Sequence, residues 1–351
     1  MIKKNKHIEI VSSSKVYLSS MGSPSRQALL STLSKQYVQV GITLIDTLAD
    51  LEELVASKPD LVLLGMKFIP TDPALGMQDP NKIWISNYLE KNDIAHTGSD
   101  GAAHRLELNK PLAKQRVQLA GLSTSPFCVV KQGMVCAKDD ISLKYPLFLK
   151  PTNRGGGQGV DEKSVVYNFD QLITKVESIS NKYQSDTLVE HYLSGREFSV
   201  AILRNENSEG FSVMPVELIT EADQQGHRIL GSSAKASDQE QVVEIKDGLI
   251  RSQISGLALS AFKALGARDY GRIDIRLYET GRPQFLEANL IPSLIDNYGN
   301  FPKACRMSLG LDHKSMIFRI VQLALNRSRT SELGELYNPA IGTGPRLAPL
   351  Q

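Results

Sequence analysis

The sequence contains little cysteine: three of its 351 residues, at positions 128, 136 and 305. An odd and scattered set excludes the disulfide framework of small secreted domains. Cys128 and Cys136 could form a redox or metal pair, but their spacing fits no zinc-binding pattern. We therefore expect a reduced, cytoplasmic protein whose thiols are packed or partly exposed side chains.

A charge excess of one sign and long apolar runs are also missing. The formal net charge of +2 gives no reason to expect a nucleic-acid or membrane partner. No window approaches the roughly 18 to 20 apolar residues of a transmembrane helix. The apolar run after the basic start, MIKKNKHIEIVSSSK, is too short and polar for a signal peptide. The remaining composition, with 41% hydrophobic and 22% charged residues, is typical of a globular protein with two or three domains.

The first third of the chain alternates strand-like and helix-like segments. This βαβ rhythm predicts an open parallel sheet with helices on its faces. The expected strands are Lys15–Ser20 and Leu61–Leu64, and the expected helices are Arg26–Tyr37, Leu51–Ser57 and Ile83–Asn92.

The rest of the chain predicts longer helices, more strands and one long polar loop, Glu221–Gln241, of the kind that is usually functional or mobile. The expected helices are Leu106–Ala120, Phe169–Tyr183, Asp247–Leu265 and Leu311–Ala324. The expected strands are Phe127–Val130, Tyr145–Lys150, Thr187–Leu193, Glu197–Arg204, Phe211–Thr220, Tyr270–Tyr278 and Gln284–Leu290.

A glycine-rich loop follows one strand, in the segment YPLFLKPTNRGGGQGV. The strand ends at Lys150, and the glycines Gly155, Gly156, Gly157 and Gly159 follow. Crowded glycines let backbone amides approach an anion closely, and the lysine adds a point charge beside it. The segment predicts a loop that folds over a nucleotide phosphate, although an ordinary turn would have the same composition.

A set of metal-type oxygen ligands lies in the last two predicted strands. Alternation places Arg272, Asp274 and Arg276 on one face of the first strand, and Glu287 and Asn289 on one face of the second. If the strands are antiparallel neighbours, these faces coincide and present carboxylate and amide oxygens to Mg²⁺ and substrate phosphate. Arg272 would then stabilise a transferring phosphoryl group. The alternative is a polar sheet face with surface ion pairs.

A third segment, TLVEHYLSGRE, has the composition of an adenosine site. Glu190 and the strand backbone can bond the adenine edge, and Glu197 can accept hydrogen bonds from ribose hydroxyls. An ordinary edge strand with exposed charges would give the same pattern.

Four segments in this order resemble the ATP-grasp superfamily, and within it the D-alanine–D-alanine ligase family. They are HTGSDGAAHRLELNKPLAKQRVQLAGLSTSPF, FLKPTNRGGGQGV, LVEHYLSGREFSV and YGRIDIRLYETGRPQFLEANLIPSL. The resemblance covers roughly residues 61–324 and extends to the mycosporine-type amino-acid ligase branch of the family.

The resemblance implies a nucleotide site, a metal site and catalytic residues. ATP would be bound by Lys110, Lys150, Gly155, Gly156, Gly157, Glu190, His191, Tyr192, Leu193 and Glu197. Two Mg²⁺ ions, which Mn²⁺ could replace, would be held by Asp274, Glu287 and Asn289. The catalytic residues would be Arg272, Lys235 and Ser293. The partners would be a small-molecule acid, an amino acid and a second copy of the chain in a homodimer.

The implied fold class is α/β: an N-terminal open parallel α/β domain followed by the two subdomains of an ATP-grasp fold. The boundaries expected are 1–105 for the N-terminal domain, 106–205 for the central subdomain with its glycine-rich lid, and 206–327 for the C-terminal subdomain with the metal site. Residues 328–351 are expected to form a disordered tail.

The chain departs from the family pattern where substrates bind. Its N-terminal segment Met21–Gln27 has no carboxylate, Gly156 and Gly157 stand where the family tends to carry serines, and the sequence after Asn289 is changed. We therefore predict an ATP-dependent carboxylate–amine ligase of natural-product biosynthesis, which activates an acid as an acyl phosphate and joins it to an amino acid. One candidate reaction joins serine or threonine to a mycosporine-glycine-like acceptor. The alternatives are a D-alanine–D-alanine ligase of cell-wall synthesis and a non-catalytic ATP-binding protein.

Overall fold

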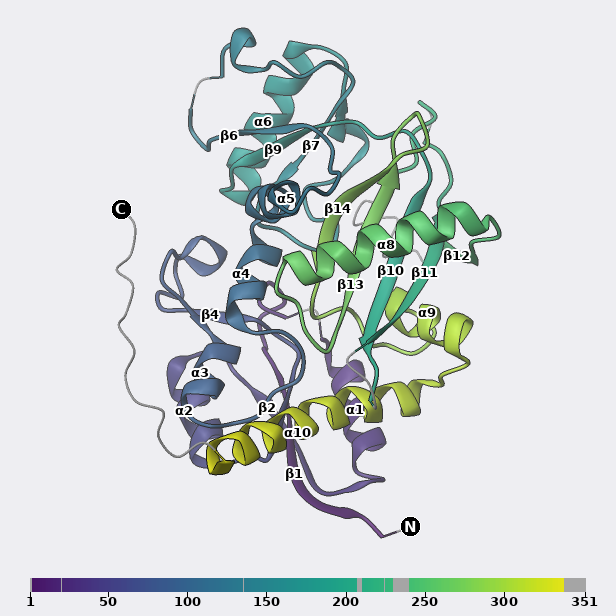
Figure 1. Cartoon of the computed structure of the whole chain (residues 1–351). Coiled ribbons are helices and arrows are strands. Elements are labelled where there is room, and N and C mark those ends of the chain that lie inside the picture. The colour runs from purple at the N-terminus through teal and green to yellow at the C-terminus, as the bar shows by residue number, and fades with distance from the viewer. Residues whose placement is uncertain are drawn as a thin grey trace.

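The computed structural model describes residues 2–19, 21–134, 136–206, 210–223, 225–229 and 240–337. It contains three larger sheets, each associated with its own helices (Figure 1). None of the helices in these ranges is long and apolar enough to cross a membrane.

The N-terminal unit is built on a parallel sheet of order β2-β1-β3, as predicted. Its elements are β1 (Lys4–Ser12), α1 (Ser23–Leu33), β2 (Tyr37–Leu44), α2 (Leu48–Ala56), β3 (Leu61–Leu64), β4 (Phe68–Pro70), β5 (Lys82–Trp84) and α3 (Ile85–Lys91). The expected strand Lys15–Ser20 is wrong, because residues 15–18 form a bend and turn, Ser20 lies outside the described residues, and the strand lies earlier, in β1. The expected helix Arg26–Tyr37 is placed too late, because α1 begins at Ser23 and ends at Leu33, and the β-branched residues after Tyr37 form β2.

The predicted helix Leu106–Ala120 is two helices, α4 (Gly101–Leu108) and α5 (Lys110–Leu119). Asn109 separates them, and its side chain accepts a hydrogen bond from the backbone N–H of Leu112 at 3.1 Å. Pro111 has no N–H, so it fits the first turn of α5 but not the interior of a continuous helix. This break makes Lys110 the first residue of a helix.

The central unit is an antiparallel sheet of order β6-β9-β7-β8 with α6 packed against it. Its elements are β6 (Phe127–Val130), β7 (Leu147–Pro151), β8 (Val165–Val166), α6 (Phe169–Tyr183) and β9 (Thr187–His191). The bounds predicted for α6 are confirmed, with Asn168 as its N-cap. In chain order, β9 is the last strand of the central sheet.

The C-terminal unit is an antiparallel sheet of order β12-β11-β10-β13-β14. Its elements are β10 (Glu197–Arg204), β11 (Phe211–Ile219), β12 (Gln241–Glu244), α8 (Gly248–Ala264), β13 (Tyr270–Leu277), β14 (Pro283–Asn289), α9 (Asn300–Leu309) and α10 (His313–Tyr337). Because β10 pairs with β11 and β13, the boundary between the two units lies between β9 and β10 and not at residue 205.

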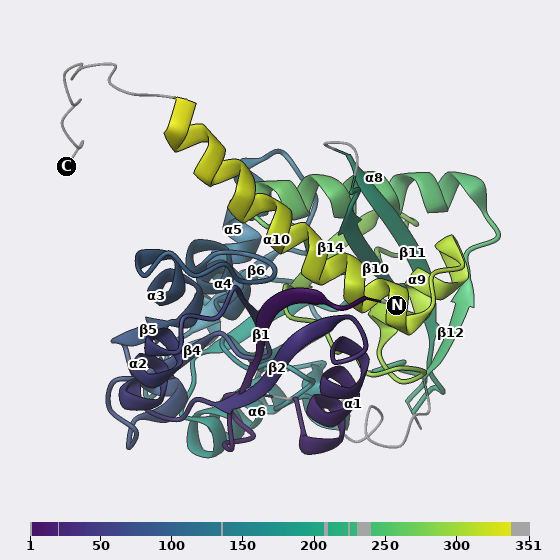
Figure 2. The same cartoon turned by 90° about the horizontal axis from the view of Figure 1, so that it is seen from below.

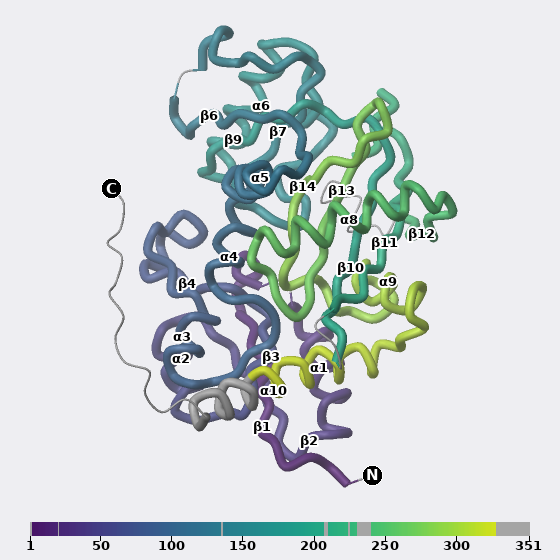
Figure 3. Tube along the Cα trace, in the orientation of Figure 1, coloured from purple at the N-terminus to yellow at the C-terminus, as the bar shows by residue number. Residues whose placement is uncertain are grey.

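One hydrophobic core joins the N-terminal sheet to the C-terminal sheet. Ile10 of β1, Leu203 of β10 and Ile317 of α10 belong to the same buried cluster, and the ring of Tyr270 packs edge-on against Phe301 at 5.7 Å. Figure 2, seen from below, and the trace in Figure 3 show α10 beside β1 and α1.

The last helix is longer than the predicted Leu311–Ala324, because α10 continues to Tyr337. The segment contains strong helix formers such as Leu333 and Glu335. The helix therefore enters the part of the chain that we expected to be a tail.

Candidate active site

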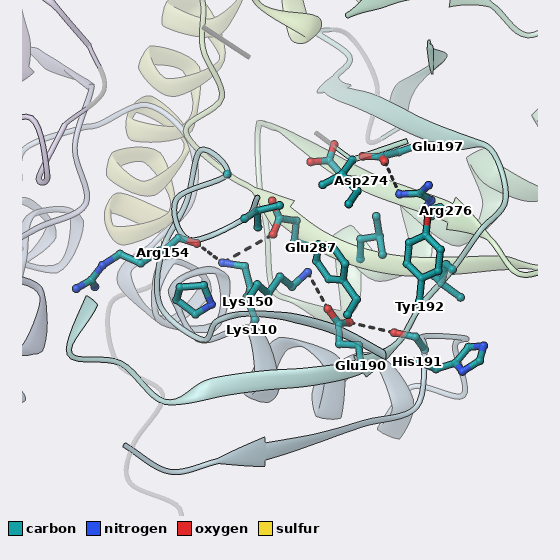
Figure 4. Close-up of a pocket in the computed structure, with 18 of the residues that line it drawn as sticks. Lys110, Lys150, Arg154, Glu190, His191, Tyr192, Glu197, Asp274, Arg276 and Glu287 are labelled. Atoms are coloured by element: carbon teal, nitrogen blue, oxygen red, sulfur yellow. Dashed lines mark hydrogen bonds and ion pairs between the residues drawn. The ribbon is translucent and has the colours of Figure 1, made fainter. Parts of the chain in front are cut away.

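A buried cluster of one carboxylate and two ammonium groups lies beneath the glycine-rich loop. The Glu190 carboxylate on β9 is 2.6 Å from the Nζ of Lys114 and 2.9 Å from the Nζ of Lys150. The Ser125 hydroxyl donates a third bond to Glu190, at 3.0 Å. Figure 4 shows Lys150 and Glu190 turned toward each other from neighbouring strands. The pairing of β7 with β9 puts Lys150 opposite Leu188 and Phe148 opposite Glu190, so Lys150 and Glu190 are diagonal neighbours on one face of the sheet.

Charge pairing dominates the ionisation of Glu190 and Lys150. Burial alone would raise the pKa of Glu190, but the two lysines outweigh it and hold the pKa at about 2. Burial would likewise lower the pKa of Lys150, but the carboxylates of Glu190 and Glu287 outweigh it and raise that pKa. For Lys114 burial is the larger effect and lowers its pKa, which the Glu190 carboxylate partly offsets. Lys150 is the lysine of this cluster that lines the pocket, and its raised pKa keeps it positively charged at neutral pH, which suits a phosphate.

Lys110 reaches the same place from the first turn of α5. Its Nζ lies 3.7 Å from the Glu287 carboxylate and donates a hydrogen bond to the backbone carbonyl of Arg154 (Figure 4). Burial lowers the pKa of Lys110, which Glu287 partly offsets and the neighbouring charge of Lys150 reinforces. Two ammonium groups thus converge on the space under the loop.

The loop that covers this space needs its glycines. Gly156, Gly157 and Gly159 have φ values of 64°, 77° and 79°, a region that side-chain-bearing residues rarely adopt. The loop is tied to α6, because Arg154 donates a hydrogen bond to the carbonyl of Tyr183 at 2.7 Å. The glycine loop therefore has a backbone conformation that suits glycine, and its residues line the two pockets beside Lys110 and Lys150.

The far end of the pocket is an aromatic and charged recess between the central and C-terminal units. Tyr192 stacks on Phe148 with ring centroids 6.4 Å apart, and the guanidinium of Arg276 lies 5.5 Å from the Tyr192 ring centroid. Arg276 also donates a bond to Glu197 at 3.2 Å. Leu193 is buried in the pocket wall. The recess offers an apolar slot with acidic acceptors at its edge.

The metal-type set lies where the predicted pairing places it. β13 and β14 are antiparallel, with Asp274 opposite Glu287 and Arg272 opposite Asn289. Arg272 binds Asp274 through two hydrogen bonds of 2.9 and 2.8 Å, and Asn289 donates to Asp274 at 3.0 Å. Burial would lower the pKa of Arg272, but Asp274 and the nearby acids outweigh it and raise that pKa.

This donor set fits Mg²⁺. In the described ranges no three His, Cys, Asp or Glu side chains gather closely enough to hold a metal. The set instead offers two carboxylates and one amide, all hard oxygen donors of the kind that bind Mg²⁺ together with phosphate oxygens and water. Ser199 donates to Asp274 at 2.9 Å and orients that carboxylate from the neighbouring strand.

A second groove adjoins the nucleotide-type pocket. It runs between the N-terminal unit and the C-terminal sheet, and it shares Gln158, Glu197 and Asp274 with the first pocket. Arg272 and Ser293 line this groove, as do Gly155 and Gly156. The metal-type carboxylate Asp274 therefore faces both compartments.

The structure brings most of the predicted residues together. Lys110, Lys150, Gly157, Glu190, His191, Tyr192, Leu193, Glu197, Asp274 and Glu287 line the first pocket, and Arg272, Ser293, Asn289, Gly155 and Gly156 line the second. Lys235 lies outside the described residues.

Sequence reasoning missed Lys114 and Ser199 and gave Arg276 no role. Lys114 follows Lys110 by four residues in α5, so helical periodicity could have placed both lysines on one face. Alternation did place Arg276 on the face of Asp274 on β13, and the structure adds its position in the recess. No signal pointed to Ser199.

A cluster that bridges two units lies beside the recess. The hydroxyl of Tyr167, before α6, is 2.5 Å from His227 Nε2, and His227 Nδ1 is 3.3 Å from Asp223. The His227 ring also packs edge-on against Tyr192 at 5.3 Å. These contacts connect the central unit to the loop after β11.

Comparisons with known proteins agree with this geometry. The sequence pattern of the family described as "D-ala D-ala ligase C-terminus" matches residues 117–322. "Uncharacterized protein y4sG" of Sinorhizobium fredii is 28% identical over 277 residues, which cover 74% of this chain and 79% of that protein. The D-alanine–D-alanine ligase of Hydrogenovibrio crunogenus is 27% identical over 274 residues, covering 77% and 82%. The solved structure of the D-alanine–D-alanine ligase from Bacillus anthracis complexed with ATP superimposes with a TM-score of 0.71 at 20% identity, covering 93% of this chain and 99% of that one. This likeness confirms the predicted fold.

Proposed function

The chain belongs to the D-alanine–D-alanine ligase family, whose pattern matches more than half of it, and on that premise we propose that it is an ATP-dependent ligase joining a carboxylic acid to an amino acid. The observation that carries the proposal is the meeting of two compartments at Asp274: a pocket with phosphate-binding features and a groove with room for other substrates. A ligase of this class must hold a nucleotide and two further molecules next to one another.

When bound, ATP supplies the phosphoryl group and Mg²⁺, held by Asp274, Glu287 and Asn289, neutralises its charge. The ammonium groups of Lys110 and Lys150 bind phosphate oxygens, exchanging their present contacts with Glu287 and Glu190 for the nucleotide. The recess at Tyr192, His191, Leu193 and Glu197 takes the adenosine.

The reaction proceeds in two displacements. A carboxylate oxygen of the acid attacks the γ-phosphorus, the bond from that phosphorus to ADP breaks, and an acyl phosphate forms. The amine nitrogen then attacks the acyl carbon, the bond from this carbon to the phosphate oxygen breaks, and the departing phosphate takes up the proton that the nitrogen loses. Arg272 lies in the groove where negative charge develops in both steps. The glycine loop excludes water, which would hydrolyse the acyl phosphate.

Two further roles extend the proposal. Ser293 lies in the groove and binds a substrate. Lys235, which lies outside the described residues, is a further catalytic residue. We also propose a homodimer, which light scattering after size-exclusion chromatography would test.

The proposed setting is natural-product biosynthesis, and the candidate reaction joins serine or threonine to a mycosporine-glycine-like acceptor. Support comes from the N-terminal segment Met21–Gln27, which offers no carboxylate to a substrate ammonium. A second candidate, D-alanine–D-alanine ligase of cell-wall synthesis, is supported by the names of relatives that cover about three quarters of the chain.

ADP release with ATP and Mg²⁺ tests the proposal, with D-alanine alone compared against amino acids paired with other acids. Product mass identifies the new C–N bond. Glu287→Gln should lower turnover by about 10²–10³-fold while the protein stays folded, and Glu279→Gln, on an exposed turn of the same sheet, is the matched control. Nucleotide binding without turnover for every pair would leave only the non-catalytic alternative.

A further inference from the structure

The two walls of the second groove differ in chemistry. The wall from the N-terminal unit is mostly apolar, with Leu18, Met66, Phe68 and Met77 among its residues, and it carries one charged side chain, Lys67. The acidic groups of the groove that the structure describes all lie on the opposite wall, and they are Glu197, Glu240 and Asp274. That wall also carries the cations Arg272 and Lys303, and Arg272 is paired with Asp274.

Lys67 is held in place by a buried acid that no ligand can reach. Its Nζ lies 2.8 Å from Glu107, whose side chain is 3% exposed. Glu107 also accepts hydrogen bonds from the backbone N–H of Leu290 at 2.8 Å and from His104 at 3.1 Å. The Glu107 carboxylate is thus fully occupied, whereas the Lys67 side chain is 25% exposed and lines the groove.

A substrate against this wall meets apolar surface and the ammonium end of the Lys67–Glu107 ion pair, whose carboxylate is buried behind it. An ammonium group there would be repelled by Lys67 and would find no carboxylate among the described residues of the N-terminal wall. A neutral or anionic oxygen group would instead accept a hydrogen bond from Lys67, because an ammonium has three N–H donors and Glu107 uses one. The wall therefore discriminates by charge.

We propose that the acid which this ligase activates has an apolar body and no free ammonium group, and that Lys67 is the residue that imposes this choice. The inference rests on the proposed function for the reaction itself. Lys67 is a specificity-determining residue, and the amine substrate occupies the opposite wall, where the acidic side chains lie.

The single tryptophan provides a direct measurement. Trp84 packs on Phe68 with ring centroids 5.6 Å apart, and Phe68 lines the groove. Its fluorescence should therefore change when an acid occupies the N-terminal wall, and Trp84→Phe should abolish the signal. Titrations in the presence of ADP and Mg²⁺ would compare 4-methylpentanoate with leucine, and propionate with D-alanine. Each pair differs only by the ammonium group.

We expect each deaminated acid to bind about tenfold more tightly than its amino acid, or better, because the repulsion acts at a partly exposed site. The double variant Lys67→Met/Glu107→Gln removes both charges without leaving a buried acid unpaired, and it should reduce this preference to about twofold or less. Lys91→Met, an exposed lysine of α3 outside the groove, should keep the preference.

Equal or tighter binding of the amino acids by the unaltered protein would overturn the inference. So would an unchanged preference in the double variant, or no response to either acid at millimolar concentration. ADP release is measured separately, so acids that bind with the expected preference but never support turnover would refute the proposed function and leave the assignment of the groove intact.

Discussion

Replacing Lys114 with methionine should destabilise the fold far more than the same change at a surface ion pair. Lys114 is completely buried and binds Glu190 at 2.6 Å, Thr124 at 2.6 Å and Ser125 at 3.0 Å. The two lysines lower the pKa of Glu190 from 4.5 to about 2, which corresponds to roughly 3 kcal/mol at about 1.4 kcal/mol per pKa unit. Breaking a buried pair costs roughly 3–5 kcal/mol. Because Lys150 still compensates Glu190, we expect a loss of about 2–3 kcal/mol.

Urea unfolding followed by circular dichroism at pH 7 would measure this free energy. Lys131→Met is the matched control, because Lys131 pairs with Asp186 at 2.8 Å with its side chain 63% exposed, and its loss should cost about 0–1 kcal/mol. If Lys114→Met were as stable as this control, the buried cluster would not stabilise the fold and our interpretation of Glu190 would be wrong.

The remaining predictions concern the pH dependence of stability, the glycine-rich loop and the contact between Tyr167 and His227. Because the pKa of Glu190 is lowered to about 2, its ion pairs contribute fully to the free energy of unfolding above about pH 4.5, and this contribution is lost as the pH falls through 2. The difference in unfolding free energy between wild type and Lys114→Met, measured by urea unfolding at a series of pH values, should therefore shrink across that window. Gly159→Ala should lower the free energy of unfolding by about 2 kcal/mol or more, because φ is 79° and the new Cβ would lie 2.4 Å from Pro151. Gly155→Ala is the matched control. A Cβ there would meet nothing within 4 Å, so the free energy of unfolding should change by less than about 1 kcal/mol. Tyr167→Phe removes the hydroxyl that binds His227 and should speed nucleotide release severalfold in stopped-flow measurements, because this contact joins the central unit to the loop after β11 beside the recess. Thermal stability should change by no more than about 3 °C. An unchanged release rate would show that this contact does not help to retain the nucleotide.

Local sequence patterns were sufficient for the parts of the site that depend on alternation. Asp274 and Glu287 could be placed opposite each other because a strand has a period of two residues and a short turn joins antiparallel neighbours. The glycines after Lys150 predicted a loop with unusual backbone angles, and Gly156, Gly157 and Gly159 have positive φ.

The misses arose where distant parts of the chain decide the structure. Nothing local to Glu197–Arg204 shows that this strand pairs with β11 and β13 and not with the central sheet. The helix break at Asn109 depends on a single cap and on Pro111, and we predicted one continuous helix over Leu106–Ala120. Lys114 was overlooked because its buried partner, Glu190 on β9, lies 76 residues further along the chain.

The core shared by the two terminal sheets limits how the molecule can open. Ile10, Leu203 and Ile317 come from the beginning, the middle and the end of the chain, yet they lie in one buried cluster, whereas the central sheet has a separate core around Leu149 and Ile179. The two terminal sheets therefore share a core that the central sheet does not enter. The chain passes into and out of the central sheet through the short crossings at residues 120–126 and 192–196. A rotation that opened the nucleotide-type pocket would bend these crossings and leave the shared core intact, and the rate of such a rotation would limit the turnover number.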